Sequence, residues 1–232
     1  MTGIFITGTD TGVGKSVVCG LLGRYLKERG YGVITQKWIQ TGSLKFSSDI
    51  RLHLRLMNTG TKEIKSYLPY ISPYTFKFSA SPHLAAGLEK KRIKPARIKR
   101  AFRFLSRRFN LVLVEGAGGV LVPFAKDKLI IDIASSLKLP ALVVCSNKLG
   151  AINHTLLTVE ALRARKIPLI GIIFNNQASG TNKIILDDNM RIIKAFSRET
   201  VLGSLPWQKN KDKLYQGFIP IGNKILKFLM GQ

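Results

Sequence analysis

The chain has few acidic residues, cysteines and histidines. Only 13 of its 232 residues are Asp or Glu, against 37 Lys or Arg, which leaves a formal net charge of +24. Cys19 and Cys145 lie in apolar stretches, so we expect two small core residues and no disulfide framework. The histidines show no metal-ligand spacing, and we assign none of them to catalysis. His53 is expected on the surface of a helix.

Long apolar runs, internal repeats and low-complexity linkers are also missing. Without 18 consecutive apolar residues the chain has no candidate membrane span, and its first apolar run starts too early to leave room for a signal peptide. A hydrophobic content of 45% and a mean hydropathy of +0.10 are typical of a globular protein. We therefore expect one domain over residues 1–232, in the cytoplasm and without a membrane partner.

The excess of positive charge raises the possibility of a nucleic-acid partner. In the densest segment, residues 90–108, Ile98, Phe102 and Leu105 fall at helical spacing, so the Lys and Arg residues between them face water. No aromatic platform or finger motif accompanies this cationic face. We expect no specific nucleic-acid binding, although weak binding at low salt would follow from the charge alone.

A glycine-rich turn, Gly-Thr-Asp-Thr-Gly-Val-Gly-Lys-Ser at residues 8–16, follows the apolar run 4–6 and precedes a helical pattern. Glycines let the backbone approach phosphates, and the N–H groups of such a turn point at them. Lys15 adds a mobile cation, and the Ser16 hydroxyl is placed to bind Mg²⁺. The loop is one residue longer than the common pattern. It predicts ATP and Mg²⁺ as cofactors; the alternative is a turn that merely starts a helix.

Strand and helix patterns alternate along the chain. We expect strands at residues 3–8, 32–37, 110–115, 140–146, 168–175 and 200–204, and helices at 14–29, 48–58, 81–90, 95–109, 128–137, 151–166 and 181–197. A short helix is expected within residues 214–231, and residues 59–80 are expected to form an irregular loop. This alternation predicts an α/β, P-loop NTPase-like fold with a mainly parallel β-sheet and helices on both faces.

Ligands of such sheets bind at the carboxyl ends of the strands, where Lys37 and Glu115 are expected. A carboxylate that closes an apolar strand is unfavourable unless it is paired or metal-bound. Ser16, Asp49 and Glu115 would together offer Mg²⁺ the oxygen ligands that it prefers. The alternatives are a salt bridge between Glu115 and a lysine, and an N-capping role for Asp49. Lys37 is either a solvated strand end or a second cation that faces Lys15 across the phosphates.

The order of these motifs resembles the dethiobiotin synthetase family. The similar blocks are residues 8–11 and 13–16, Lys37 with Thr41-Gly42, Ser48-Asp49, residues 72–76, Ser81-Pro82-His83, residues 114–119, residues 148–154 and Pro206-Trp207. They span positions 3 to about 208, close to the whole chain. The loop alone is shared by many ATPases, whereas the blocks in this order are specific.

The resemblance implies ATP-dependent carboxylation of 7,8-diaminononanoate with CO₂ and closure of a ureido ring, through a phosphorylated carbamate. The products would be dethiobiotin, ADP and phosphate, in biotin biosynthesis. Lys15 and Lys37 would be the catalytic cations, and Ser16, Asp49 and Glu115 the Mg²⁺ ligands. Family members are homodimers with the active site at the subunit interface, so a second copy of the chain is an expected partner.

The same resemblance implies two groups of binding residues. The ATP group is Gly12, Val13, Gly14, Lys15, Ser16, Val17, Asp49, Glu115, Gly116, Ala117, Gly118, Asn175, Asn176, Pro206, Trp207 and Gln208. The substrate group is Thr11, Thr41, Gly150, Ala151, Ile152 and Asn153, of which the last four would open a helix that receives the substrate carboxylate from the neighbouring subunit.

The chain departs from the family at Gly12, where other members often carry an acid, and at Lys213, near a position where some members have one. Three rival classes remain. An amide-forming synthetase of the same superfamily usually carries a glutaminase domain, which these residues lack. A partitioning-type ATPase needs an additional lysine early in its phosphate loop, and residues 8–13 contain none. The third is a nucleic-acid module with incidental nucleotide binding.

Overall fold

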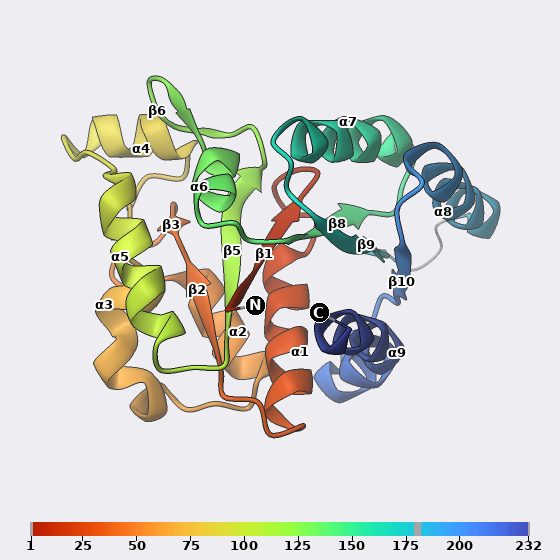
Figure 1. The fold of residues 1–232 in the computed structure, drawn as a ribbon, viewed down its shortest axis with the longest axis horizontal. Coiled ribbons are helices and arrows are strands. Elements are labelled where there is room, and N and C mark those ends of the chain that lie inside the picture. The colour runs from red at the N-terminus through yellow and green to blue at the C-terminus, as the bar shows by residue number, and fades with distance from the viewer. Residues whose placement is uncertain (1, 179–181, 232) are drawn as a thin grey trace.

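The computed structural model describes residues 2–178 and 182–231, and its centre is a six-stranded parallel sheet with the order β10-β9-β8-β1-β5-β2 (Figure 1). The strands are β1 (Gly3–Gly8), β2 (Val33–Lys37), β5 (Leu111–Gly119), β8 (Ala141–Ser146), β9 (Leu169–Asn175) and β10 (Val201–Leu205). In the register of β2 with β5, Lys37 lies opposite Glu115. Parallel pairing therefore brings the carboxyl ends of these strands to one edge of the sheet.

Helices cover both faces of this sheet (Figure 1). They are α1 (Lys15–Lys27), α2 (Ser48–Leu56), α3 (Leu68–Ile71), α4 (Pro82–Leu88), α5 (Pro95–Ser106), α6 (Ile130–Ser136), α7 (Ala151–Ala164), α8 (Lys183–Ser197) and α9 (Lys211–Met230). Small sheets pair β3 (Ile39–Gln40) with β4 (Tyr74–Thr75), and β6 (Pro123–Ala125) with β7 (Lys128–Leu129). A 3₁₀ helix, η1, spans Thr61–Tyr67.

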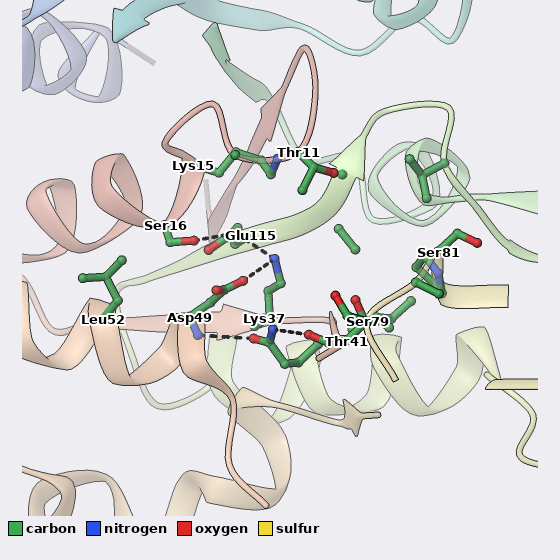
Figure 2. A pocket seen from close by; sticks show the side chains of 18 of the residues that line it. Thr11, Lys15, Ser16, Lys37, Thr41, Asp49, Leu52, Ser79, Ser81 and Glu115 are labelled. Carbon is green, nitrogen blue, oxygen red and sulfur yellow. Dashed lines mark hydrogen bonds and ion pairs between the residues drawn. The ribbon is translucent and has the colours of Figure 1, made fainter. Parts of the chain in front are cut away.

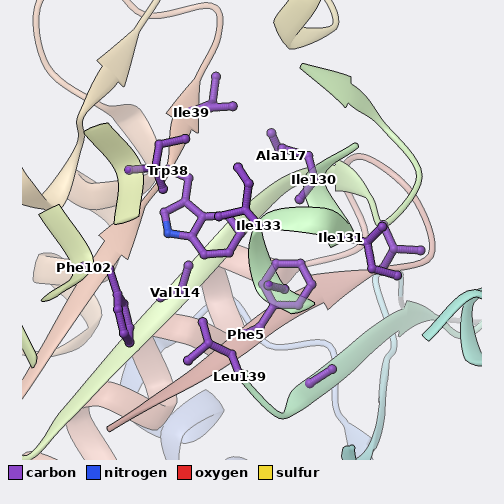
Figure 3. Packing of buried hydrophobic residues seen from close by; sticks show 14 of the residues in the cluster. Phe5, Trp38, Ile39, Phe102, Val114, Ala117, Ile130, Ile131, Ile133 and Leu139 are labelled. Atoms are coloured by element: carbon purple, nitrogen blue, oxygen red, sulfur yellow. The ribbon is translucent and has the colours of Figure 1, made fainter. Parts of the chain in front are cut away.

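Alternation along β1 divides the core into two layers. Ile4 and Ile6 pack with the buried faces of α1 and α9, whereas Phe5 points to the opposite face of the sheet. There Phe5 stacks on Trp38 at a ring-centroid distance of 5.3 Å, beside Ile130 and Ile133 of α6 (Figure 3). Because both faces are covered, the strands read as continuous apolar runs.

The predicted strands are confirmed to within one residue, except that β5 continues to Gly119. The apolar face predicted for the helix around residues 95–109 is also confirmed, since Ile98, Phe102 and Leu105 of α5 are buried. Cys19 and Cys145 are both free and buried, as expected. The predicted parallel sheet with helices on both faces is therefore correct.

Three local predictions are wrong. Residues 128–129 form β7, which pairs with β6, so α6 begins only at Ile130. Residues 59–80 are not an irregular loop throughout, because η1, α3 and β4 lie within them. The C-terminal helix α9 is long, with 20 residues, because the Asn210 side chain caps its start and its buried face packs on the core despite the internal Pro220.

Candidate active site

The phosphate loop joins β1 to α1 at the centre of the sheet. Gly12 (φ +76°) and Gly14 (φ +102°) adopt left-handed conformations that favour glycine. Asn175, at the end of β9, donates its Nδ2 hydrogen to the Val13 carbonyl at 2.9 Å, and a side chain at Gly14 would collide with that amide. The loop is thus held in shape by its own glycines and by a neighbouring strand end.

A cavity of about 620 Å³ opens between this loop and the ends of β2 and β5 (Figure 2). Of the residues predicted from the sequence, its walls contain Thr11, Gly12, Gly14, Lys15, Ser16, Val17, Lys37, Thr41, Asp49, Glu115, Ala117 and Gly118. The site prediction did not include Ile39, Gln40, Leu52, Ser79, Ala80, Ser81, Pro82 and Val122, which also line it. Ser81 and Pro82 belong to the Ser81-Pro82-His83 block that resembles the family, so the sequence could have indicated this part of the wall.

Lys37 lies at the centre of a buried charge cluster. Its Nζ is 2.7 Å from Asp49 Oδ2, 2.7 Å from Glu115 Oε1 and 2.7 Å from the Gly116 carbonyl oxygen. Burial alone would lower the pKa of Lys37, but the two carboxylates outweigh it and raise that pKa above its ordinary value. The alternative of a solvated strand end is wrong, because Lys37 is only 4% exposed.

Glu115 is held by three donors. Ser16 Oγ donates to its Oε1 at 3.0 Å and Lys37 reaches the same oxygen, whereas His53 Nε2 lies 2.8 Å from Oε2. Burial would raise the pKa of Glu115, yet Lys37 and His53 together hold it well below its usual range. The salt bridge with a lysine that the sequence left open does exist. The N-capping alternative for Asp49 is wrong, because Ser47 Oγ accepts the Ile50 N–H and caps α2.

The expectation for His53 is wrong. Its side chain is fully buried and faces Glu115, because α2 turns that side toward the sheet. The sequence spacing could have indicated this position. His53 follows Asp49 by four residues, so both side chains project from one face of the helix.

Lys15 stands apart from this cluster. Its Nζ donates to the Asp10 carbonyl at 2.6 Å, and the side chain is largely buried. Burial, and then the positive charge of Lys37, lower the pKa of Lys15 to about 8 although the carboxylates oppose this. The carbonyl is neutral, so a bound phosphate group would give the Lys15 ammonium an anionic partner.

The oxygen atoms of Ser16, Asp49 and Glu115 suit a hard cation such as Mg²⁺. Among residues 2–178 and 182–231, no three His, Cys, Asp or Glu side chains form a metal-binding cluster. Two carboxylates and a hydroxyl nevertheless match the way Mg²⁺ binds, since this ion usually keeps several waters and takes its remaining ligands from phosphates. The Lys37 ammonium lies between the two carboxylates, which shows that this region of the cavity favours positive charge.

The other predicted residues lie outside the walls of this cavity. Val13 is buried, and Gly116 accepts the Lys37 hydrogen bond. Asn176 pairs through its backbone with Leu205 at the ends of β9 and β10. Three exposed residues, Pro206, Trp207 and Gln208, follow β10.

Residues 150–153 lie at the start of α7, close to the phosphate loop. Ala151 lines a separate small cavity of about 90 Å³ together with Asp10, Thr11 and Gly12. Gly150 is the left-handed N-cap of α7, followed by the half-buried Ile152 and the exposed Asn153. Of the predicted substrate residues, Thr11 lines both cavities, Ala151 lines the smaller one and Thr41 lines the larger one.

Comparison with solved structures agrees with this architecture. The fold resembles that of MinD from Aquifex aeolicus, with a TM-score of 0.59 and 15% identity over 99% of this chain and 97% of that one. It also resembles pNOB8 ParA bound to nonspecific DNA, with a TM-score of 0.60 and 11% identity over 99% of each chain. At such identities the likeness concerns the fold alone. Together with the glycine-rich loop and its lysine, it defines a P-loop NTPase-like protein.

The sequence comparisons are more particular. Residues 2–213 match a family model described as an AAA domain. The chain is 38% identical to the ATP-dependent dethiobiotin synthetase BioD of Anaeromyxobacter dehalogenans, over 90% of this chain and 91% of that protein. It is 36% identical to the BioD of Methanococcus vannielii, over 86% and 91% of the two chains. The chain therefore belongs to the dethiobiotin synthetase family.

Within the described parts of the chain, we find no helix with both the length and the apolar character that crossing a membrane requires.

Proposed function

We propose that the protein is an ATP-dependent dethiobiotin synthetase of biotin biosynthesis, with one P-loop domain over residues 1–232, located in the cytoplasm. It carboxylates 7,8-diaminononanoate with CO₂ and closes the ureido ring, and it releases dethiobiotin, ADP and phosphate. The observation that carries the proposal is the cluster of Lys37, Asp49 and Glu115 beside the phosphate loop. It occurs in a chain whose curated relatives bear this name.

The chemistry needs cations more than it needs a nucleophilic side chain. One amine of the substrate adds to CO₂, loses a proton and becomes a carbamate. A carbamate oxygen attacks the γ-phosphorus of ATP, and the bond to the β-phosphate oxygen breaks to release ADP. The second amine then attacks the carbamate carbon, loses a proton and displaces phosphate. Because the carbamate and the phosphates are all anionic, Lys15 and Lys37 hold them together and stabilise the charge that spreads over the transferred group. Orientation supplies most of the remaining rate enhancement.

Mg²⁺ is the proposed metal cofactor, held by Ser16, Asp49 and Glu115. When bound, the ion neutralises charge on the phosphate oxygens. Support comes from the all-oxygen donor set and from Ser16 Oγ, which lies 3.0 Å from Glu115 Oε1. Lys37 shares both carboxylates with this site, so its ammonium stays close to the transferred phosphoryl group.

The remaining residues divide into nucleotide and substrate sites. In our proposal the loop from Gly12 to Val17 and residues 116–118 surround the phosphates, and the segments 175–176 and 206–208 hold the adenine. Thr11 and Thr41 contact the diamine. Residues 150–153 of a second copy receive the substrate carboxylate in a homodimer. In support, α7 begins there with 14 residues, and helix N-termini attract carboxylates.

The decisive experiment is mass analysis of the products from diaminononanoate, bicarbonate and ATP. We expect a product with the mass of dethiobiotin, and ATP hydrolysis that depends on the diamine and bicarbonate together. Lys37→Ala, with its fold checked by circular dichroism, should lose most of the turnover. ATP hydrolysis that is unaffected by leaving out the diamine would contradict the proposed function, and near-normal turnover of K37A would contradict the role of Lys37.

A further inference from the structure

His53 is a buried group that the proposed reaction does not use. It lies one turn after Asp49 on α2, and its side chain has no exposed surface. Its Nε2 is 2.8 Å from Glu115 Oε2, on the opposite side of the carboxylate from Ser16 and Lys37, which both reach Oε1. The two oxygens of Glu115 are thus divided between two sets of partners.

The direction of this hydrogen bond follows from the chemistry of the pair. An ionised carboxylate only accepts hydrogen bonds, so the Nε2 atom of His53 carries the hydrogen and donates it. Within the described residues, Nδ1 of His53 is buried and has no partner. The contact with Glu115 is therefore the interaction that orients the ring. Burying the unpaired Nδ1 is unfavourable, and a leucine at this position would avoid that cost.

We propose that His53 is a positioning residue that holds Glu115 Oε1 toward the phosphate loop. This inference rests on the proposed function, in which Glu115 binds the Mg²⁺ of the nucleotide. A donor fixed on Oε2 prevents the carboxylate from rotating about its terminal bond, so Oε1 remains beside Ser16 Oγ. Groups that orient a metal ligand in this way typically change metal affinity 10–100-fold when they are removed.

Two variants separate positioning from packing. His53→Leu fills a similar volume but cannot donate a hydrogen bond, whereas His53→Gln keeps an N–H donor at a similar reach. Mn²⁺ is the probe, titrated by electron paramagnetic resonance into the full-length protein saturated with a non-hydrolysable ATP analogue. We expect H53L to weaken Mn²⁺ binding about 10–100-fold. H53Q should stay within about threefold of the wild type, with unchanged KM for the diamine in both.

Thermal unfolding of the same samples provides the control. If H53L and H53Q shift the unfolding temperature but bind Mn²⁺ as the wild type does, His53 is only a packing residue and the proposal is wrong. If the wild type itself binds no Mn²⁺ with nucleotide, the proposed metal site fails, and the positioning role with it. His53→Met, of more adaptable shape, is a second donor-free variant in case H53L does not fold.

Discussion

The two lysines of the site illustrate how neighbours decide the state of a side chain. Lys37 has three oxygen partners, including two carboxylates, and its pKa is raised. Lys15 has one carbonyl partner, and burial together with Lys37 lowers its pKa to about 8. The charged form of Lys15, the cation proposed to bind the phosphates, is thus destabilised in the nucleotide-free protein. Binding of an anion would offset this destabilisation.

We predict that Lys15→Met stabilises the nucleotide-free protein by up to about 3 kcal/mol at pH 7, while it abolishes nucleotide binding. Below pH 8, Lys15 is charged in both the folded and the unfolded state, so the wild type bears the full penalty. From pH 8 to 10.5 the unfolded chain retains this proton and the folded chain loses it, so wild-type stability rises toward that of the variant. Urea unfolding at pH 7 and pH 9.5 measures the difference.

Lys27→Met is the matched control, because Lys27 lies on the same helix with a side chain that is 43% exposed. Its Nζ contacts Thr59 and Glu63 at the surface, so the unfolding free energy of the variant should remain within about 1 kcal/mol of the wild type. A K15M variant less stable than the wild type at pH 7 would show that Lys15 is not under electrostatic strain.

At the scale of elements, α9 is the least expected part of the fold. It lies beside α1, and Gly222 faces the ring of Tyr25 so closely that an added Cβ would be 2.6 Å from a ring atom. The hydroxyl of Tyr25 donates to Asn223 at 2.5 Å, which fixes the ring against α9. Gly222 thus sets how closely the two helices approach.

We predict that Gly222→Ala destabilises the protein by about 1–3 kcal/mol, because the ring and the helix must separate. Gly87→Ala in α4 is the control. No heavy atom of the described structure outside the local helix backbone lies within 4 Å of its added Cβ, and it should stabilise the protein by up to about 1 kcal/mol. Guanidinium chloride unfolding measures both. Equal effects of the two substitutions would contradict the packing role of Gly222.

At the scale of the whole molecule, the dominant property is the net charge of +24. On α5 the apolar face is buried, and Arg100 and Arg103 belong to the charged side of the helix. Such a surface attracts any polyanion by releasing counterions, without sequence preference. The resemblance to a DNA-bound ParA concerns the fold and adds nothing to this argument.

We therefore predict salt-sensitive, sequence-independent binding to duplex DNA. Fluorescence anisotropy should show affinity falling about 10³-fold between about 50 and 200 mM NaCl. DNA should leave ATP turnover unchanged at physiological salt. Stimulation of turnover by DNA under those conditions would favour the partitioning-type ATPases over a biosynthetic enzyme.

Much of the fold could be predicted from the sequence because its signals are local. The six strands are short apolar runs between turn residues, and the glycines of the phosphate loop are required by their own backbone angles. Lys37 and Glu115 could be placed at one edge because parallel strands align their carboxyl ends. The start of α6 and the length of α9 were missed, because pairing with β6 and packing against α1 decide them.

The strands, the phosphate loop and the charged groups at the strand ends could be assigned from the residues alone, since each depends on neighbours within a few positions. The order of the strands in the sheet depends on pairing between distant segments. Long-range packing buries His53 against Glu115, 62 residues away in the chain. It also places residues 79–82 in one wall of the cavity. A helical pattern states which residues share a face, but what covers that face depends on distant segments.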